Sequence, residues 1–170
     1  LLKDEAELLT QQQNWDSVAY VCIGSYLKND FHLPLAQAGL SKAVSCPLRS
    51  TLDKRTQIKR SLEKFERVII SIDGLNRNSM GNFGLSPGAI ALIHDLAEAK
   101  DVFVTLFGNP YSLEDFDGFE QIEGLLVAYE GVKESRSAAA QAILGRLPVS
   151  GRLPVSIGDY FPAGAGMLTE

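Results

Sequence analysis

The sequence is poor in the residues that build disulfide scaffolds and metal sites. Among 170 residues there are two cysteines, Cys22 and Cys46, and two histidines, and no Cys-x-x-Cys pair occurs. Two cysteines do not make a disulfide framework, and a structural zinc site takes about four nitrogen or sulfur ligands. Both cysteines lie in apolar runs, so we expect buried free thiols and no metal site. Whether Cys22 and Cys46 pair stays open at this point.

The sequence also lacks a dominant sign of charge and a long hydrophobic run. Lysine and arginine number 16 against 21 aspartate and glutamate, which gives a net charge of −5 with no basic block. We therefore expect no nucleic-acid partner, because such binders carry basic patches. No apolar run approaches the roughly 18–20 residues of a membrane span, so no span is expected either. The length and the 45% hydrophobic content suit one globular domain.

What the sequence does contain is a series of short apolar runs separated by amphipathic stretches. The runs are continuous and rich in β-branched residues, as in strands buried on both faces of a parallel sheet. The stretches between them predict helices, and Ser86-Pro87 is a helix N-cap followed by a first-turn proline. The predicted strands are residues 18–23, 42–46, 68–72, 102–107 and 125–129, and the predicted helices lie near residues 34–38, 51–65, 87–97 and 132–144.

This alternation predicts the α/β class. We expect a three-layer sandwich with a mostly parallel sheet of about five to six strands and helices on both faces. Ligands of such folds lie beyond the carboxyl ends of the strands. Four polar residues that follow predicted strands are therefore candidates for ligand binding or for contact with another domain, namely Asp73, Asn82, Asn109 and Tyr111. The plainer alternatives are an Asp-Gly turn at Asp73 and a turn with a packed tyrosine at residues 109–111.

No catalytic motif emerges from these loops. The first strand is followed by Gly-Ser-Tyr-Leu-Lys-Asn, which is neither a dinucleotide nor a P-loop motif, and no Gly-x-Ser-x-Gly pentapeptide occurs. A receiver-like phosphoacceptor at Asp73 lacks the extra carboxylates that would hold Mg²⁺. Glu114, Asp115 and Asp117 are expected to form a solvated loop rather than an acid/base pair. We therefore assign no catalytic residue and expect no cofactor.

One hexapeptide occurs twice in succession. Residues 145–150 and 151–156 both read Gly-Arg-Leu-Pro-Val-Ser. Two copies are too few for a solenoid, which needs about three repeats. A residue before proline favours extended backbone, and proline is tolerated on a sheet edge. We therefore expect an extended segment along the edge of the sheet.

The second copy of the hexapeptide and the Pro-x-Gly at residues 162–164 resemble the closing motif of the C-terminal α/β sandwich domain of glycoside hydrolase family 3. The first copy departs from the family pattern as an extra hexapeptide, and the family's Leu-Phe-Gly reads Ile-Leu-Gly here, a volume-tolerant change. Further stretches that resemble the family, in the same order, are residues 1–5, 106–111, 128–130 and 138–145.

The resemblance implies an accessory domain that packs on an N-terminal (β/α)₈ barrel of the same parent chain and is not catalytic alone. It is closest to the β-N-acetylhexosaminidase type of Bacteroidetes, in which a serine-hydrolase domain follows. It also implies a periplasmic or secreted location, and a sugar at the domain interface. We divide the chain into an incoming segment at residues 1–15, one α/β domain at 16–158 and an outgoing linker at 159–170. The alternatives are a stand-alone carbohydrate- or partner-binding module and a degenerate receiver-like domain.

Overall fold

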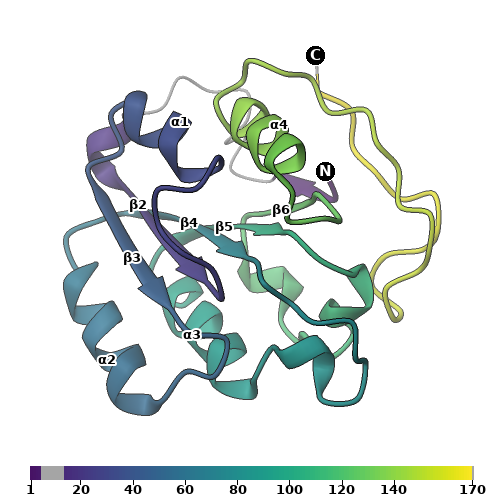
Figure 1. The fold of residues 1–170 in the computed structure, drawn as a ribbon, viewed down its shortest axis with the longest axis horizontal. Coiled ribbons are helices and arrows are strands. Elements are labelled where there is room, and N and C mark those ends of the chain that lie inside the picture. Colours follow the sequence, from purple (N-terminus) through teal and green to yellow (C-terminus); the bar gives the residue numbers. More distant parts are fainter. Residues whose placement is uncertain (5–13, 170) are drawn as a thin grey trace.

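The computed structural model describes residues 1–4 and 14–169. Six strands form one sheet in the order β1-β6-β5-β4-β2-β3, parallel throughout except for β1, which runs antiparallel to β6. This architecture confirms the predicted α/β class with a mostly parallel sheet (Figure 1). The strands are β1 (Lys3–Asp4), β2 (Val18–Ile23), β3 (Lys42–Cys46), β4 (Arg67–Ile72), β5 (Asp101–Leu106) and β6 (Gly124–Val127), and the helices are α1 (His32–Gln37), α2 (Leu52–Ser61), α3 (Pro87–Ala97) and α4 (Lys133–Ile143).

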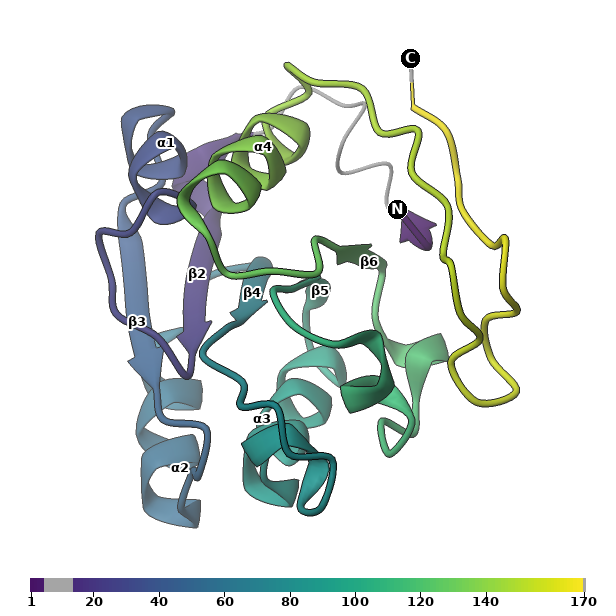
Figure 2. The same ribbon diagram turned by 45° about the vertical axis from the view of Figure 1, so that its right-hand side comes forward.

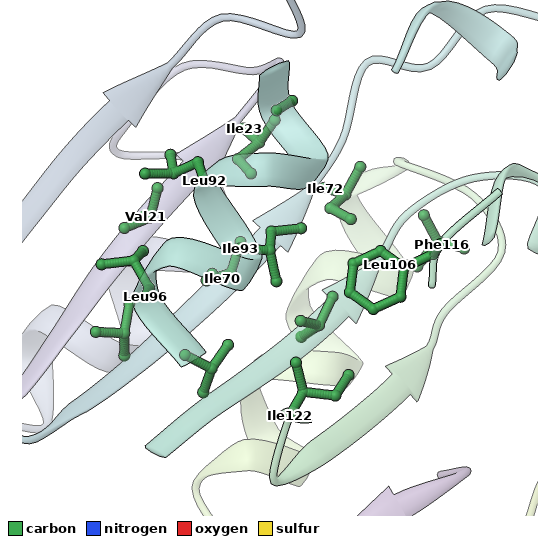
Figure 3. Packing of buried hydrophobic residues seen from close by; sticks show 14 of the residues in the cluster. Val21, Ile23, Ile70, Ile72, Leu92, Ile93, Leu96, Leu106, Phe116 and Ile122 are labelled. Atoms are coloured by element: carbon green, nitrogen blue, oxygen red, sulfur yellow. The ribbon is translucent and has the colours of Figure 1, made fainter. Parts of the chain in front are cut away.

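The helices form a layer on each side of the sheet. Helices α1 and α4 cover one face and α2 and α3 cover the other (Figures 1 and 2). Alternate residues of each strand enter one core or the other, as the two-residue period of a strand requires. Figure 3 shows the core under α3, where Leu92, Ile93 and Leu96 pack on Ile70 and neighbouring strand residues. The sandwich thus has two cores, one on each face of the sheet.

The two cysteines lie on opposite faces of the sheet. Cys22 belongs to the core under α1 and α4, whereas Cys46 belongs to the core under α2 and α3. Both are buried free thiols. Burial raises the pKa of the Cys46 thiol, so that thiol is held in its less reactive neutral form. Because the sheet lies between the two side chains, Cys22 and Cys46 do not form a disulfide bond.

The helix ends follow the sequence closely. The Oγ of Ser86 accepts the N–H of Ala89 at 3.2 Å, and Pro87 begins α3, as predicted. At the end of α4, the N–H of Gly145 donates to the carbonyl of Ala142 and the N–H of Arg146 to that of Gln141. These two hydrogen bonds form a Schellman motif, which requires the left-handed φ of +67° that Gly145 adopts.

The chain after α4 forms two extended legs that lie beside the N-terminus (Figure 2). The outgoing leg contains both hexapeptides, and the returning leg pairs with it where the N–H of Leu153 donates to the carbonyl of Ala165 at 2.8 Å. The N–H of Met167 donates to the carbonyl of Leu1, and the N–H of Leu2 to that of Leu125. Strand β1, which the sequence did not predict, therefore joins the last leg to β6. The proposed division of the chain at residues 15 and 158 stays a prediction.

A buried polar cluster lies between α1 and the sheet. The Tyr20 hydroxyl lies 2.6 Å from the Ser71 hydroxyl, and the His32 ring stacks on Tyr20 with a centroid distance of 5.1 Å. The Nδ1 of His32 accepts the N–H of Lys28 at 2.9 Å, an interaction that only the neutral ring can make. Burial, and secondarily the charge of Lys28, lower the pKa of His32 in the folded state.

Stability should therefore fall on acidification through the ordinary histidine pKa of about 6.5. Above that pH both states hold His32 neutral, and below it the unfolded chain takes up a proton that the folded domain resists. The slope contributed by one proton is at most about 1.4 kcal/mol per pH unit. Urea unfolding between about pH 7.5 and 5.5 should show this loss, and His32→Gln should flatten it. In His94→Gln, which removes the other histidine, the loss should persist; if it vanishes there instead, the assignment to His32 is wrong.

Candidate functional site

The loops at the carboxyl ends of β2 and β4 cross in direct contact. Gly24 and Gly74 both have left-handed backbone, with φ of +84° and +73°. A Cβ on Gly24 would overlap the carbonyl oxygen of Asp73, and a Cβ on Gly74 would overlap that of Gly24. Only glycine allows both the conformation and the approach. The crossing fixes the position of Asp73, the first candidate residue, at the end of β4.

Asp73 is held by an arginine of α4. The Nε and Nη2 of Arg136 lie 2.8 and 2.7 Å from the Asp73 Oδ2, and the Asp73 Oδ1 accepts the N–H of Gly74 at 2.6 Å. The Asp73 side chain is 4% exposed and that of Arg136 is 14% exposed. Both carboxylate oxygens are thus engaged, and the pair ties the end of β4 to the start of α4.

A polar cavity of about 470 Å³ opens beside this ion pair. It lies at the carboxyl ends of β4, β5 and β6, the place where open α/β sheets bind ligands. Its walls include Asp73, Asn109, Arg77 and Tyr129. The structure therefore brings two of the four candidate residues, Asp73 and Asn109, to one cavity. The groups around it can donate and accept hydrogen bonds, and none of them is a nucleophile with an adjacent base.

Tyr129 adopts a backbone conformation that non-glycine residues rarely hold. Its φ is +61°, which costs about 1–3 kcal/mol and persists only where the surroundings enforce it. Its neighbour Gly131 lies so close to Asp73 that a Cβ would overlap the Oδ1. Partial burial raises the pKa of the Tyr129 phenol, which therefore stays a neutral hydrogen-bond donor. The loop between β6 and α4 thus presents Tyr129 over the cavity while packing tightly on the ion pair.

The other two candidates lie elsewhere. Asn82 lines a second cavity of about 780 Å³ next to the start of α3, and its Nδ2 is buried without a hydrogen-bond partner. It belongs to the left-handed run of residues 81–84, in which Gly81, Asn82, Phe83 and Gly84 have φ between +50° and +90°. Tyr111 is exposed and lines neither cavity. The Asn109 Oδ1 accepts the N–H of Tyr111 at 3.1 Å, so the turn at residues 109–111 is present.

The acids of the loop after β5 lie at the surface. Glu114, Asp115 and Asp117 are all exposed, as the sequence predicted. Within residues 1–4 and 14–169, no three histidine, cysteine, aspartate or glutamate side chains gather as a metal site. In the same residues no helix has both the length and the apolar character to cross a bilayer.

Arg136 is a site residue that the sequence did not indicate. It is the fourth residue of α4, after the N-cap Val132, and the same helix begins with another basic residue, Lys133. No local signal therefore singles out Arg136, and its role follows from the contact with Asp73, which is distant in the sequence.

The fold and this cavity define an open α/β sandwich domain with a polar crevice at its carboxyl-end edge. No protein-family model matches the chain, and no curated protein matches it. Among solved structures, a glycoside hydrolase family 3 β-N-acetylglucosaminidase from Paenibacillus sp. str. FPU-7 matches with a TM-score of 0.71 and 20% identity, over 93% of this chain and 30% of that chain. A fungal multi-domain GH3 β-N-acetylglucosaminidase with a GCN5-related glucosamine N-acetyltransferase region matches with a TM-score of 0.69 and 22% identity, over 96% of this chain and 18% of that chain.

These matches confirm the predicted resemblance at the level of the fold. The chain has the architecture of one part of family 3 β-N-acetylglucosaminidases, and it spans less than a third of the length of either enzyme. The remainder of those chains has no counterpart here.

Proposed function

We propose that this chain is the accessory C-terminal domain of a family 3 glycoside hydrolase of the β-N-acetylhexosaminidase type. The main support for this proposal is the shared fold. It covers 93% of this chain and 30% of the chain of a family 3 β-N-acetylglucosaminidase. Its role is to pack on the (β/α)₈ barrel of the parent chain and to wall one side of the sugar site. A following serine-hydrolase domain and a periplasmic or secreted location belong to the same proposal.

The polar groups at the carboxyl-end edge support a positioning role rather than catalysis. Glycoside hydrolysis needs two carboxyl groups on either side of the scissile bond. Two carboxylates line the cavity, of which Asp73 is engaged by Arg136 and Gly74 and Glu130 is exposed to solvent. The acids of the loop at residues 114–117 also lie on the exposed surface. A buried ion pair of this kind fixes loop positions and leaves the catalytic pair to another domain.

The isolated 170-residue chain should give no turnover of nitrophenyl N-acetylglucosaminide, whereas the full-length parent should hydrolyse it. The physical reason is that the proposed barrel supplies the nucleophile and this chain does not. Release of nitrophenol measures both proteins under the same conditions, and a cooperative urea transition of the isolated chain serves as the control that it is folded. Robust turnover by the isolated chain would overturn the proposal.

A stand-alone carbohydrate-binding module is the second candidate, and the 470 Å³ polar cavity favours it. Titration with N-acetylglucosamine at low millimolar concentration should then shift amide resonances around Asp73, Asn109 and Tyr129. Residues 98–100, between α3 and β5 at the amino-end edge of the sheet, provide an internal control that should not move. Clustered shifts would favour the binding module, and their absence at saturating sugar would leave the accessory role as the better account.

A further inference from the structure

The segment between β4 and α3 holds three of the six asparagines of the chain, Asn76, Asn78 and Asn82. The first two form successive Asx turns. The Asn76 Oδ1 accepts the N–H of Asn78 at 2.8 Å, and the Asn78 Oδ1 accepts the N–H of Met80 at 3.0 Å. Residues 76–81 are all exposed. The carboxamides of Asn76 and Asn78 are therefore open to water and folded against the backbone that follows them.

Asn78 is followed by a residue whose main-chain nitrogen has no hydrogen-bond partner. Within residues 1–4 and 14–169, no group accepts the N–H of Ser79. An Asx turn bends the carboxamide over the next peptide bond, which brings the Asn78 Cγ toward the Ser79 nitrogen. The side chain of serine is small and not branched at Cβ, so it leaves this approach open. The N–H of Met80, which donates to the Asn78 Oδ1, polarises the carbonyl toward attack.

The other five asparagines each lack one of these conditions. Asn109 forms the same turn, but proline follows it and has no N–H. Asn29 is 3% exposed, and the N–H of the residue after Asn82 donates to a main-chain carbonyl at 3.0 Å. Asn14 and Asn76 precede tryptophan and arginine, whose bulk obstructs the approach. Only one carboxamide of the described chain thus combines exposure, the turn and a small successor with a free N–H.

We propose that Asn78 is a site of spontaneous modification, at which the side chain loses ammonia. The Ser79 nitrogen bonds to the Asn78 Cγ, the bond from Cγ to Nδ2 breaks, and the Ser79 proton leaves with the amide group as ammonia. Water then opens the cyclic imide at one of its two carbonyl carbons. Opening at Cγ gives aspartate, and opening at the main-chain carbonyl carbon gives β-linked isoaspartate. The step needs water and no oxidant, reductant or enzyme.

The products change a loop that borders both cavities. Arg77 lines the polar cavity and Ser79 lines the larger one. Aspartate at position 78 keeps an oxygen for the Met80 N–H and adds a negative charge next to Arg77 in the sequence. Isoaspartate also takes the carbonyl that accepts the Phe83 N–H out of the main chain, so the turn is lost. The charge and shape of this edge therefore change as the molecule ages, whatever its function.

Incubation of the folded chain in mildly alkaline buffer, followed by peptide mass spectrometry, tests the proposal. Asn78 should gain the mass difference between a carboxamide and a carboxylic acid, in two products that chromatography separates, at least about tenfold faster than any other asparagine. Ser79→Val, whose branched side chain crowds the nitrogen, should slow Asn78 to the rate of Asn76, and Ser79→Gly should accelerate it. Urea titration should show that both variants unfold like the unmodified chain, because the Ser79 side chain is exposed.

Two comparisons decide the outcome. Asn109 provides the background rate, since no imide can form at the nitrogen of the proline after it. Conversion of Asn78 in the urea-unfolded chain but not in the folded chain would mean that the hydrogen bonds of the loop protect it, and the proposal would be wrong. Equal rates at Asn76 and Asn78 in the folded chain, or a rate that Ser79→Val leaves unchanged, would also contradict it.

Discussion

Arg136→Met should destabilise the domain by about 3–5 kcal/mol, the largest loss that we expect from any single substitution. The variant leaves the Asp73 carboxylate, whose side chain is 4% exposed, without the guanidinium that it contacts at 2.7 and 2.8 Å. A buried charge without a partner costs far more than the pair itself contributes. The loss is measured as the difference in free energy of unfolding from urea titration at neutral pH.

Two further variants show whether the loss comes from the stranded carboxylate. Asp73→Asn combined with Arg136→Met removes both charges and keeps an oxygen for the Gly74 N–H, so it should recover much of the stability. Arg77→Met removes an exposed arginine from the wall of the same cavity and should cost no more than about 0.5 kcal/mol. Equal losses in Arg136→Met and in the double variant would contradict the ion-pair explanation.

The parts of the fold that the sequence predicted are those fixed by local pattern. The strands at residues 18–23 and 42–46 were placed to the residue. The first is a continuous apolar run that ends at Gly24, and the second is a weaker run that ends before Pro47. The start of α3 was predicted from Ser86-Pro87, because a serine N-cap followed by a first-turn proline is a local signal for the start of a helix. Layering followed, since strands buried on both faces require helices on both sides.

The parts that escaped prediction depend on contacts between residues far apart in the sequence. Strand β1 is only Lys3–Asp4, and it exists because β6 and the returning C-terminal leg lie beside it. The candidate site was only half assembled for the same reason. Asp73 and Asn109 line the same cavity because β4 and β5 are neighbours in the sheet. Asn82 instead lies in the left-handed turn at residues 81–84 and lines the second cavity, beside α3.

The duplicated hexapeptide shows how far environment overrides sequence. Gly145 has a φ of +67° and caps α4, while Gly151 makes no such turn. Arg146 is exposed, while the Arg152 Nη1 donates to the carbonyls of Gly164 and Gly166 at 3.2 and 3.3 Å. Leu147 is 43% exposed, while Leu153 is 2% exposed within the core under α2 and α3. The first copy therefore connects the end of α4 to the second copy, and the second copy fixes the segment to the core through Leu153.

Leu153→Ala should therefore cost about 2–5 kcal/mol of unfolding free energy, and Leu147→Ala no more than about 0.5 kcal/mol. The two substitutions change the same residue in the same six-residue context, so intrinsic propensity cancels and burial alone separates them. Leu153 loses its contacts with the core and leaves a cavity, whereas water already reaches Leu147. Urea titration of the two variants beside the wild-type chain measures the difference.

Identical copies also allow the chain to shift its register by six residues, and the same pair of variants detects that exchange. If the Leu-Pro-Val at residues 147–149 could replace the one at residues 153–155 in the core, Leu153→Ala would be rescued and both variants would cost little. The hydrogen bonds of Gly145 and Arg146 that close the C-terminus of α4 oppose the shift. A six-residue shift would move both residues along the outgoing leg, away from α4, and would break these bonds. Gly145→Ala, which disfavours the cap by about 1–2 kcal/mol, should destabilise the chain where Gly151→Ala does not. A large loss confined to Leu153→Ala and Gly145→Ala would establish that the two copies do different work in one fixed register.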